Sequence, residues 1–175
     1  MVLISPLTYK VVAYQSVPDY DMDECVDWAI EMIELGYDTE NLIILAGLTK
    51  RVNYFETGKF LQATISELGL KLKPADDGIV SYSSYYIMQI ANGVNVRQNL
   101  KILSNYVMDV GYHSSVYDFL NLHWAWDAME WNDGQQWYWP DATLDNIESL
   151  IKDLAKQWLI SNKRIYSQFI DDNAL

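Results

Sequence analysis

The chain has 175 residues, half of them apolar and 14% aromatic, so it can form a sizeable core and is not mainly disordered. Its 24 Asp and Glu residues outnumber 12 Lys and Arg residues, which gives a net charge of −12. This charge argues against binding to nucleic acid or to an anionic membrane surface, because both would repel the protein.

The N-terminal segment, residues 1–20, precedes the first long helix. Thr8 can cap a helix over residues 8–16, whereas the β-branched pair Val11-Val12 favours a strand. Helix is preferred because no second convincing strand exists to pair with this segment. Both alternatives stay open.

Residues 25–48 predict a helical hairpin. Asp21 is expected to cap the first arm, with Glu24 returning a hydrogen bond to the cap's own amide. Apolar side chains then recur at helical spacing until Gly36, on Met22, Cys25, Val26, Ala29, Met32 and Ile33. The second arm, residues 42–46, is apolar nearly all round and is therefore expected to be buried.

More helices follow along the chain. Asn53 is expected to cap the next one, with Phe55 on its apolar face. Residues 71–78 form a linker that is too short to separate independent domains. Asn95 is expected to cap a later helix, and a long amphipathic helix follows Thr143.

Glycine ends five of these helices, at Gly36, Gly47, Gly69, Gly93 and Gly111. This regularity predicts an all-α fold, an antiparallel bundle of about seven helices with short turns. We expect a single helical domain over residues 1–175, with a frayed tail over residues 171–175.

Several helix ends occur in a familiar order: Trp28-Ala29, GYDT at residues 36–39, LIILAGL at residues 42–48, and ELGL at residues 67–70. The turn IANG at residues 90–93 continues the pattern. This order resembles a family of small uncharacterised bacterial proteins, over residues 8–110. The resemblance implies a helical fold and a bacterial cytoplasmic setting, but no activity and no functional residues. The Trp-rich segment after residue 120 departs from the family pattern, so this protein's own function is expected there.

Residues 19–40 form an acidic stretch, and no Lys or Arg follows it until Lys50. Within it, Asp23, Asp27 and Glu31 are spaced four residues apart and share one helix face. The simplest interpretation is a solvated face, and the alternatives are a docking surface for a basic protein and a divalent-cation site. No loop with calcium-binding spacing is present, so no metal is expected.

Residues 123–139 hold five tryptophans: Trp124, Trp126, Trp131, Trp137 and Trp139. Indoles are costly to leave in water and recur at binding hot spots. They could cover the helical core, form a protein-binding surface, or line a pocket that stacks sugars or bases. In that pocket Asp127, Glu130 and Asp133 would be the polar partners. The candidate binding residues in this segment are Trp124, Trp131, Trp137 and Trp139.

Catalysis is the weakest hypothesis. His123 and Asp127 are four residues apart, so they could face each other on a helix, and Glu130 could complete a metal site. The chain has no H-E-x-x-H motif, no Gly-rich phosphate loop and no G-x-S-x-G motif. We therefore expect no catalytic residue and no cofactor, although the enzyme class stays open.

The localisation expected from the sequence is cytoplasmic. The N-terminus has no basic region before its first apolar residues, so a secretory signal is not expected. The single cysteine, Cys25, cannot form an internal disulfide and is expected to be a buried apolar side chain.

These observations predict an interaction module that binds a basic protein partner, through the acidic hairpin or the Trp-rich segment. An immunity- or antitoxin-like role is one form of this hypothesis. The alternative is a small-molecule or carbohydrate binder at residues 123–139, and the third is a hydrolase centred on His123, Asp127 and Glu130. The oligomeric state stays open.

Overall fold

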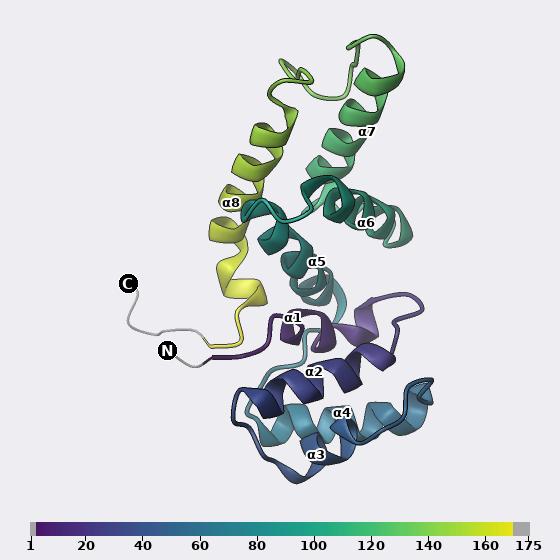
Figure 1. Cartoon of the computed structure of the whole chain (residues 1–175), viewed down its shortest axis with the longest axis vertical. Helices are drawn as coiled ribbons and strands as arrows, with labels where there is room; N and C mark the ends of the chain where they lie inside the picture. Colours follow the sequence, from purple (N-terminus) through teal and green to yellow (C-terminus); the bar gives the residue numbers. More distant parts are fainter. Residues whose placement is uncertain (1–2, 170–175) are drawn as a thin grey trace. The chain divides into compact units, whose positions relative to one another are not determined.

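The computed structural model of this protein describes residues 3–169. Every regular element in that range is helical (Figure 1). The elements are α1 (Thr8–Val11), the 3-10 helix η1 (Tyr14–Ser16), α2 (Asp23–Glu34), α3 (Glu40–Ala46), α4 (Tyr54–Glu67), α5 (Ala75–Ala91), α6 (Val96–Asp109), α7 (Tyr117–Trp131) and α8 (Ile147–Tyr166). The predicted all-α class is confirmed, with eight α-helices in the described residues rather than about seven. The antiparallel order stays a prediction.

The helices gather into two compact units. Unit 1 contains the described residues up to Tyr82 together with residues 166–169, and unit 2 contains residues 83–165. The single domain expected over residues 1–175 stays a prediction. The tail expected to fray, residues 171–175, lies outside the described residues. No helix within residues 3–169 is long and apolar enough to cross a bilayer.

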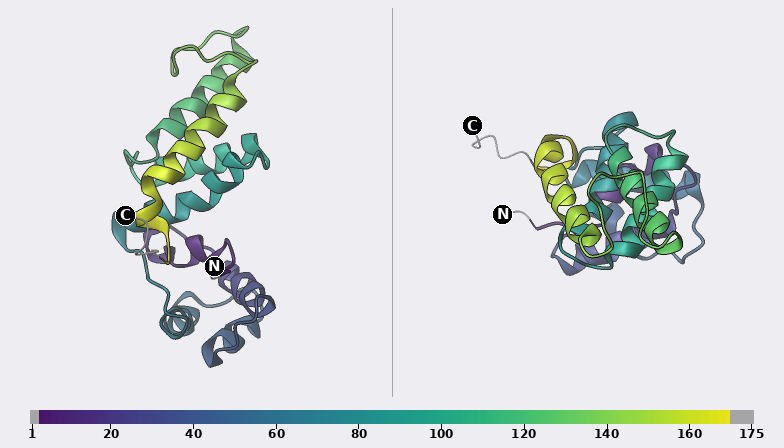
Figure 2. Two further views of the ribbon diagram at one scale, coloured as in Figure 1. Left: turned by 90° about the vertical axis from the view of Figure 1, so that its left-hand side faces the viewer. Right: turned by 90° about the horizontal axis from the view of Figure 1, so that it is seen from above.

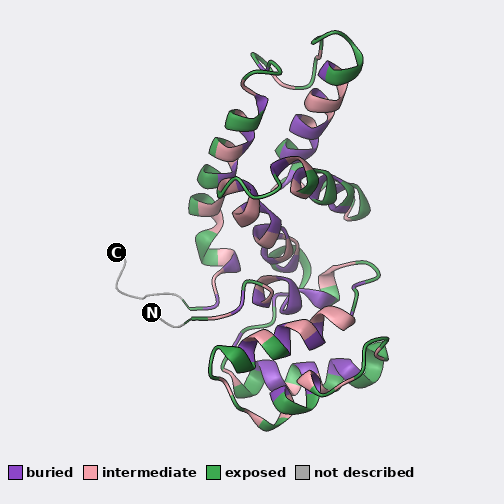
Figure 3. Ribbon diagram, in the orientation of Figure 1, coloured by how far each residue is buried: buried purple, intermediate pink, exposed green. Residues whose placement is uncertain are grey.

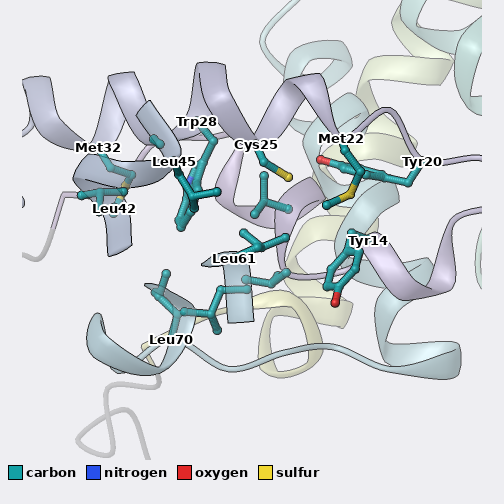
Figure 4. Close-up of a cluster of buried hydrophobic side chains, with 14 residues drawn as sticks. Tyr14, Tyr20, Met22, Cys25, Trp28, Met32, Leu42, Leu45, Leu61 and Leu70 are labelled. Atoms are coloured by element: carbon teal, nitrogen blue, oxygen red, sulfur yellow. The ribbon is translucent and has the colours of Figure 1, made fainter. Parts of the chain in front are cut away.

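The core of unit 1 forms around α2, whose apolar stripe packs against α1 and α3 (Figure 4). Trp28 is its largest fully buried side chain, and the indole N–H donates a hydrogen bond to the Thr8 hydroxyl at 2.9 Å. In Figure 4, Leu45 of α3 lies beside Trp28 and Leu42 lies beside Met32, and both leucines are fully buried. Residues 8–16, for which the sequence allowed either a helix or a strand, contain the helices α1 and η1.

Two predicted helix caps form only in part. The Asp21 side chain accepts a hydrogen bond from the Asp23 amide at 3.0 Å, but Glu24 pairs with Lys10 instead of the Asp21 amide. The Lys10 side chain is only 5% exposed, and leaving its buried ammonium without a counter-charge would be costly. Glu24 therefore pairs with Lys10 and not with the Asp21 amide, which lies near the surface. Asn95 has a left-handed backbone, φ 44°, and its side chain makes no cap bond.

The cap predicted at Asn53 is confirmed, because its side chain accepts hydrogen bonds from Phe55 N and Glu56 N. Phe55 itself is 79% exposed, which contradicts the inner position expected for it. The buried face of α4 is centred on Leu61. Phe55 lies six residues earlier, about 120° away around the helix at roughly 100° per residue.

The expectation that the second arm of the hairpin is buried all round is also wrong. Leu42 and Leu45 of α3 are fully buried, but Ile43 is 55% exposed and Ile44 is exposed as well. The physical reason is that α3 packs against α2 and α4 only. Its opposite side therefore stays in contact with solvent.

Unit 2 contains most of α5, all of α6 and α7, and nearly all of α8. The buried faces of α6 and α7 pack against each other, with Leu100, Leu103, Phe119 and Leu122 fully buried. A connection over residues 132–146 joins the end of α7 to the start of α8 (Figure 2). It carries part of the Trp-rich segment.

Candidate functional site

The connection from α7 to α8 exposes large aromatic side chains. We call residues 131–146 the indole loop. Trp131 is 85% and Trp137 80% exposed, and Tyr138 is exposed as well. Figure 3 colours much of the connection between α7 and α8 as exposed. The other two candidates, Trp124 and Trp139, are half-buried, and the Trp124 ring packs on the Tyr138 ring with centroids 5.6 Å apart. Trp131 and Trp137 therefore do not cover the core of unit 2.

The indole loop is held together by two side-chain amides. The Gln136 oxygen accepts hydrogen bonds from the backbone N–H groups of Tyr138 and Trp139, both at 2.8 Å. Asn146 accepts one from Thr143 N at 2.8 Å and donates one to the Asp141 carbonyl at 2.9 Å. Trp137 and Tyr138 are thus displayed by an ordered backbone.

The surroundings of the indole loop are acidic. Residues 102–151 contain eight Asp and Glu residues but no Lys or Arg. In the loop itself, Asp133, Asp141 and Asp145 are exposed, and no ion pair to them is found within residues 3–169. Asp133 and Asp141 also have positive φ, 48° and 60°, a conformation that Asp tolerates better than most residues.

A charged network lies beside this loop, between α6 and α7. Arg97 pairs with Asp127 and, at 3.0 Å, with Glu130. Its guanidinium carbon lies 4.6 Å from the centroid of the Trp126 ring, a cation–π contact. Thirty residues separate Arg97 from Asp127, so the sequence analysis missed this pairing, which depends on the packing of α6 against α7.

His123 belongs to the same network. Its Nε2 lies 3.4 Å from the Asp127 carboxylate, so the predicted approach of these two residues is confirmed. Burial lowers the pKa of His123, and the nearby Asp127 carboxylate opposes that shift. The ring Nδ1 is buried without a hydrogen-bond partner. A buried neutral imidazole is consistent with this geometry.

The metal site considered at His123, Asp127 and Glu130 is not assembled. Arg97 engages both carboxylates. Within the part of the chain that the structure describes, no group of three or more His, Cys, Asp or Glu side chains is placed to hold a metal ion. The network therefore joins two helices rather than presenting free ligands.

A cavity of about 390 Å³ opens at the start of α6. It is lined by Gly93, Asn95, Val96, Arg97, Gln98, Trp126 and Glu148. Its volume lies in the range of small-ligand pockets. Trp126 is the one tryptophan of the Trp-rich segment that borders it.

The acidic candidates of the first hairpin lie on α2, and each has a partner in unit 1. One Asp23 oxygen accepts hydrogen bonds from Arg51 N at 2.7 Å and Val52 N at 3.0 Å. Asp27 pairs with Lys50 at 2.7 Å, and Glu31 accepts a hydrogen bond from the Ser5 hydroxyl. These three carboxylates therefore connect α2 to other segments of unit 1.

No family model, curated protein or solved structure matches this chain. The resemblance to a family of uncharacterised bacterial proteins therefore stays a prediction. Function has to be argued from the exposed side chains and charges of the chain itself.

Proposed function

We propose that this protein is an interaction module that binds a basic protein partner, with the indole loop at the centre of the contact. The observation that carries the proposal is the pair of highly exposed indoles, Trp131 and Trp137, on an ordered loop. Tryptophan is enriched among the residues that dominate binding energy in protein interfaces. A loop that is already ordered loses less conformational entropy on binding.

The charge of the loop selects a basic partner. Asp133, Asp141 and Asp145 surround the indoles in sequence, and no Lys or Arg of the loop neutralises them. Lys and Arg side chains of a partner could pair with these carboxylates and stack on the indole faces. Arg97 on Trp126 is an example of that stacking within this chain.

The first acidic hairpin supports this contact less well. Its three candidate carboxylates, Asp23, Asp27 and Glu31, already have partners in unit 1. In the setting that the sequence suggests, the protein acts in the bacterial cytoplasm, in an immunity- or antitoxin-like role. Nucleic acid is not expected as a partner because of the net charge of −12.

The test is a comparison of three tagged proteins as baits in lysate of the source organism: wild type, the double variant Trp131→Ala/Trp137→Ala, and Phe55→Ala. Phe55 is a matched control because it is an equally exposed aromatic residue in unit 1. We expect one basic protein to be retained by wild type and by the control but lost with the double variant. Retention of the same proteins by all three baits would contradict the proposal.

The contribution of charge is tested with the purified partner. The triple variant Asp133→Asn/Asp141→Asn/Asp145→Asn removes the carboxylates, and Asn accepts the positive φ of residues 133 and 141. We expect slower association at low salt and a shallower dependence of the rate on salt. A salt dependence equal to that of wild type would show that these carboxylates do not contact the partner.

A second candidate function is the binding of a small polar ligand or carbohydrate. It is favoured by the solvent-exposed indoles of Trp131 and Trp137 and by the cavity that Trp126 borders. Such a ligand would change tryptophan fluorescence, and the change would be nearly independent of salt. A titration with a panel of oligosaccharides, repeated with Trp126→Phe and with the double indole variant, separates the cavity from the loop.

A further inference from the structure

The hairpin of α2 and α3 leaves an unusual amount of apolar surface in solvent. Within residues 30–44, five large apolar side chains are exposed: Ile30, Ile33, Leu35, Ile43 and Ile44. Single exposed apolar residues are normal on any protein. Five of them within fifteen residues, on two helices that pack against each other and on the residue that ends α2, are a concentration that typically marks a binding surface.

The α3 helix makes the strongest case. It carries apolar residues on all sides, a pattern typical of helices that are covered on every side. Leu42 and Leu45 are fully buried in unit 1, whereas Ile43 is 55% and Ile44 37% exposed. Solvating isoleucines costs roughly 25 cal/mol per Å² of apolar surface. The outer side of α3 therefore has the composition of a surface that is covered in a complex.

In the described part of the chain, the charges without an ion-pair partner at the turn between α2 and α3 are negative, whereas Lys50 pairs with Asp27 of α2. Glu34, Asp38 and Glu40 are exposed at the turn between α2 and α3. Residues 11–49 contain no Lys or Arg, and among residues 3–169 no ion pair to these three carboxylates is found. An occupant must therefore combine apolar side chains with positive charge. A second copy of the same hairpin and an anionic membrane are both disfavoured, because like charges would be brought together.

We propose that the α2–α3 hairpin is a docking surface for a basic amphipathic helix. The apolar face of that helix contacts Ile30, Ile43 and Ile44, and its Lys and Arg side chains face Glu34, Asp38 and Glu40. Apolar residues at helical spacing are the usual anchors of a helical ligand. The surface lies in unit 1 and does not depend on the function proposed for the indole loop of unit 2.

The test uses two fluorescein-labelled peptides of 18 residues made of Leu and Lys, one with its leucines in a helical stripe and one with the same composition scrambled. Their binding to the full chain is followed by fluorescence anisotropy near physiological salt. We expect the amphipathic peptide to bind about tenfold more tightly than the scrambled one, since charge is equal and only the apolar stripe differs. Equal affinity for both peptides would overturn the proposal.

Three variants locate the peptide. Ile43→Ser and Ile30→Ser replace exposed side chains, and each should weaken binding of the amphipathic peptide about fivefold or more. Ile160→Ser is the matched control, because Ile160 is a 77% exposed isoleucine on α8 in unit 2. We expect it to bind the peptide as wild type does. An equal loss for Ile160→Ser and Ile43→Ser would also overturn the proposal.

Two further variants separate this surface from the indole loop. Glu34→Gln/Glu40→Gln keeps every isoleucine but removes two carboxylates, so it should weaken the binding of both peptides. A circular dichroism spectrum equal to that of wild type shows that the weaker binding does not come from unfolding. Trp131→Ala/Trp137→Ala removes any contact of the peptides with the indole loop, and the preference for the amphipathic over the scrambled peptide should persist. Loss of peptide binding in that double variant would assign the peptide to the indole loop and contradict a site at the α2–α3 hairpin.

Discussion

The side-chain oxygen of Gln136 accepts a hydrogen bond from the backbone N–H of Trp139 at 2.8 Å, in the middle of the indole loop. The same oxygen accepts a second bond from Tyr138 N, also at 2.8 Å. Trp137 lies between the glutamine and these two amides in sequence. One polar side chain therefore holds the backbone that displays an exposed indole.

Replacing Gln136 by Ala should loosen the loop without removing any indole. Exposed hydrogen bonds contribute about 0.5–1.5 kcal/mol each, so global stability should fall by roughly 1 kcal/mol. Cleavage of residues 132–146 by a protease should become faster, and partner binding several-fold weaker, because the loop must then be ordered on binding. Gln135→Ala is the control from the neighbouring exposed residue. Equal cleavage rates for the two variants would contradict this role of Gln136.

Removing the acceptor of the Trp28 indole should destabilise unit 1. In Thr8→Val the shape of the side chain is kept, but the buried indole N–H loses its partner at 2.9 Å. An unsatisfied buried donor costs about 1–3 kcal/mol. Urea unfolding followed by circular dichroism measures the loss. Thr8→Ser keeps the hydroxyl and should lose less, and a serine variant less stable than the valine variant would argue against the hydrogen bond.

Burial of His123 should make stability depend on pH. Burial lowers its pKa below the ordinary 6.5, so below pH 6.5 the unfolded chain binds the proton more readily than the folded one. The stabilisation is complete above about pH 6.5 and is lost as pH falls through the lower pKa of the folded state. The charges that face the ring are Asp127, Glu130, Arg97 and Lys101.

This dependence is measured by urea unfolding of wild type and His123→Gln at several pH values between about 5 and 7.5. Both proteins share all other titrating groups, so the difference between their curves isolates His123. Wild type should lose more stability than the variant towards acidic pH. Parallel curves would show that His123 does not retain a lowered pKa in the folded protein.

Cys25 should be unreactive in the folded protein. Its side chain is fully buried, and burial together with the carboxylates of Glu24, Asp21 and Asp23 raises its pKa to about 12. A thiolate is required for attack on a disulfide reagent. Labelling with an aromatic disulfide near pH 8 should therefore follow the opening of unit 1 and become fast in urea. Labelling as fast without urea as with it would contradict this burial.

Much of unit 1 could be predicted from residues close together in sequence. The apolar stripe predicted on α2 is buried from Met22 to Met32, but its last residue, Ile33, is 38% exposed, so the prediction is wrong there. The cap at Asn53 is confirmed, because it depends on side chains within one helical turn. The same local reasoning located the tryptophans of the candidate site and the approach of His123 to Asp127. It could not tell which indoles are exposed.

The remaining features depend on segments far apart in the chain. Arg97 meets Asp127 because α6 packs on α7, and Glu24 pairs with Lys10 because α1 packs on α2. Ile43 is exposed because α3 is covered on one side only, although residues 42–46 are all apolar in sequence. Helical periodicity ranks the faces of one helix, whereas burial is decided by which other helices cover them, and that is a property of the packed chain.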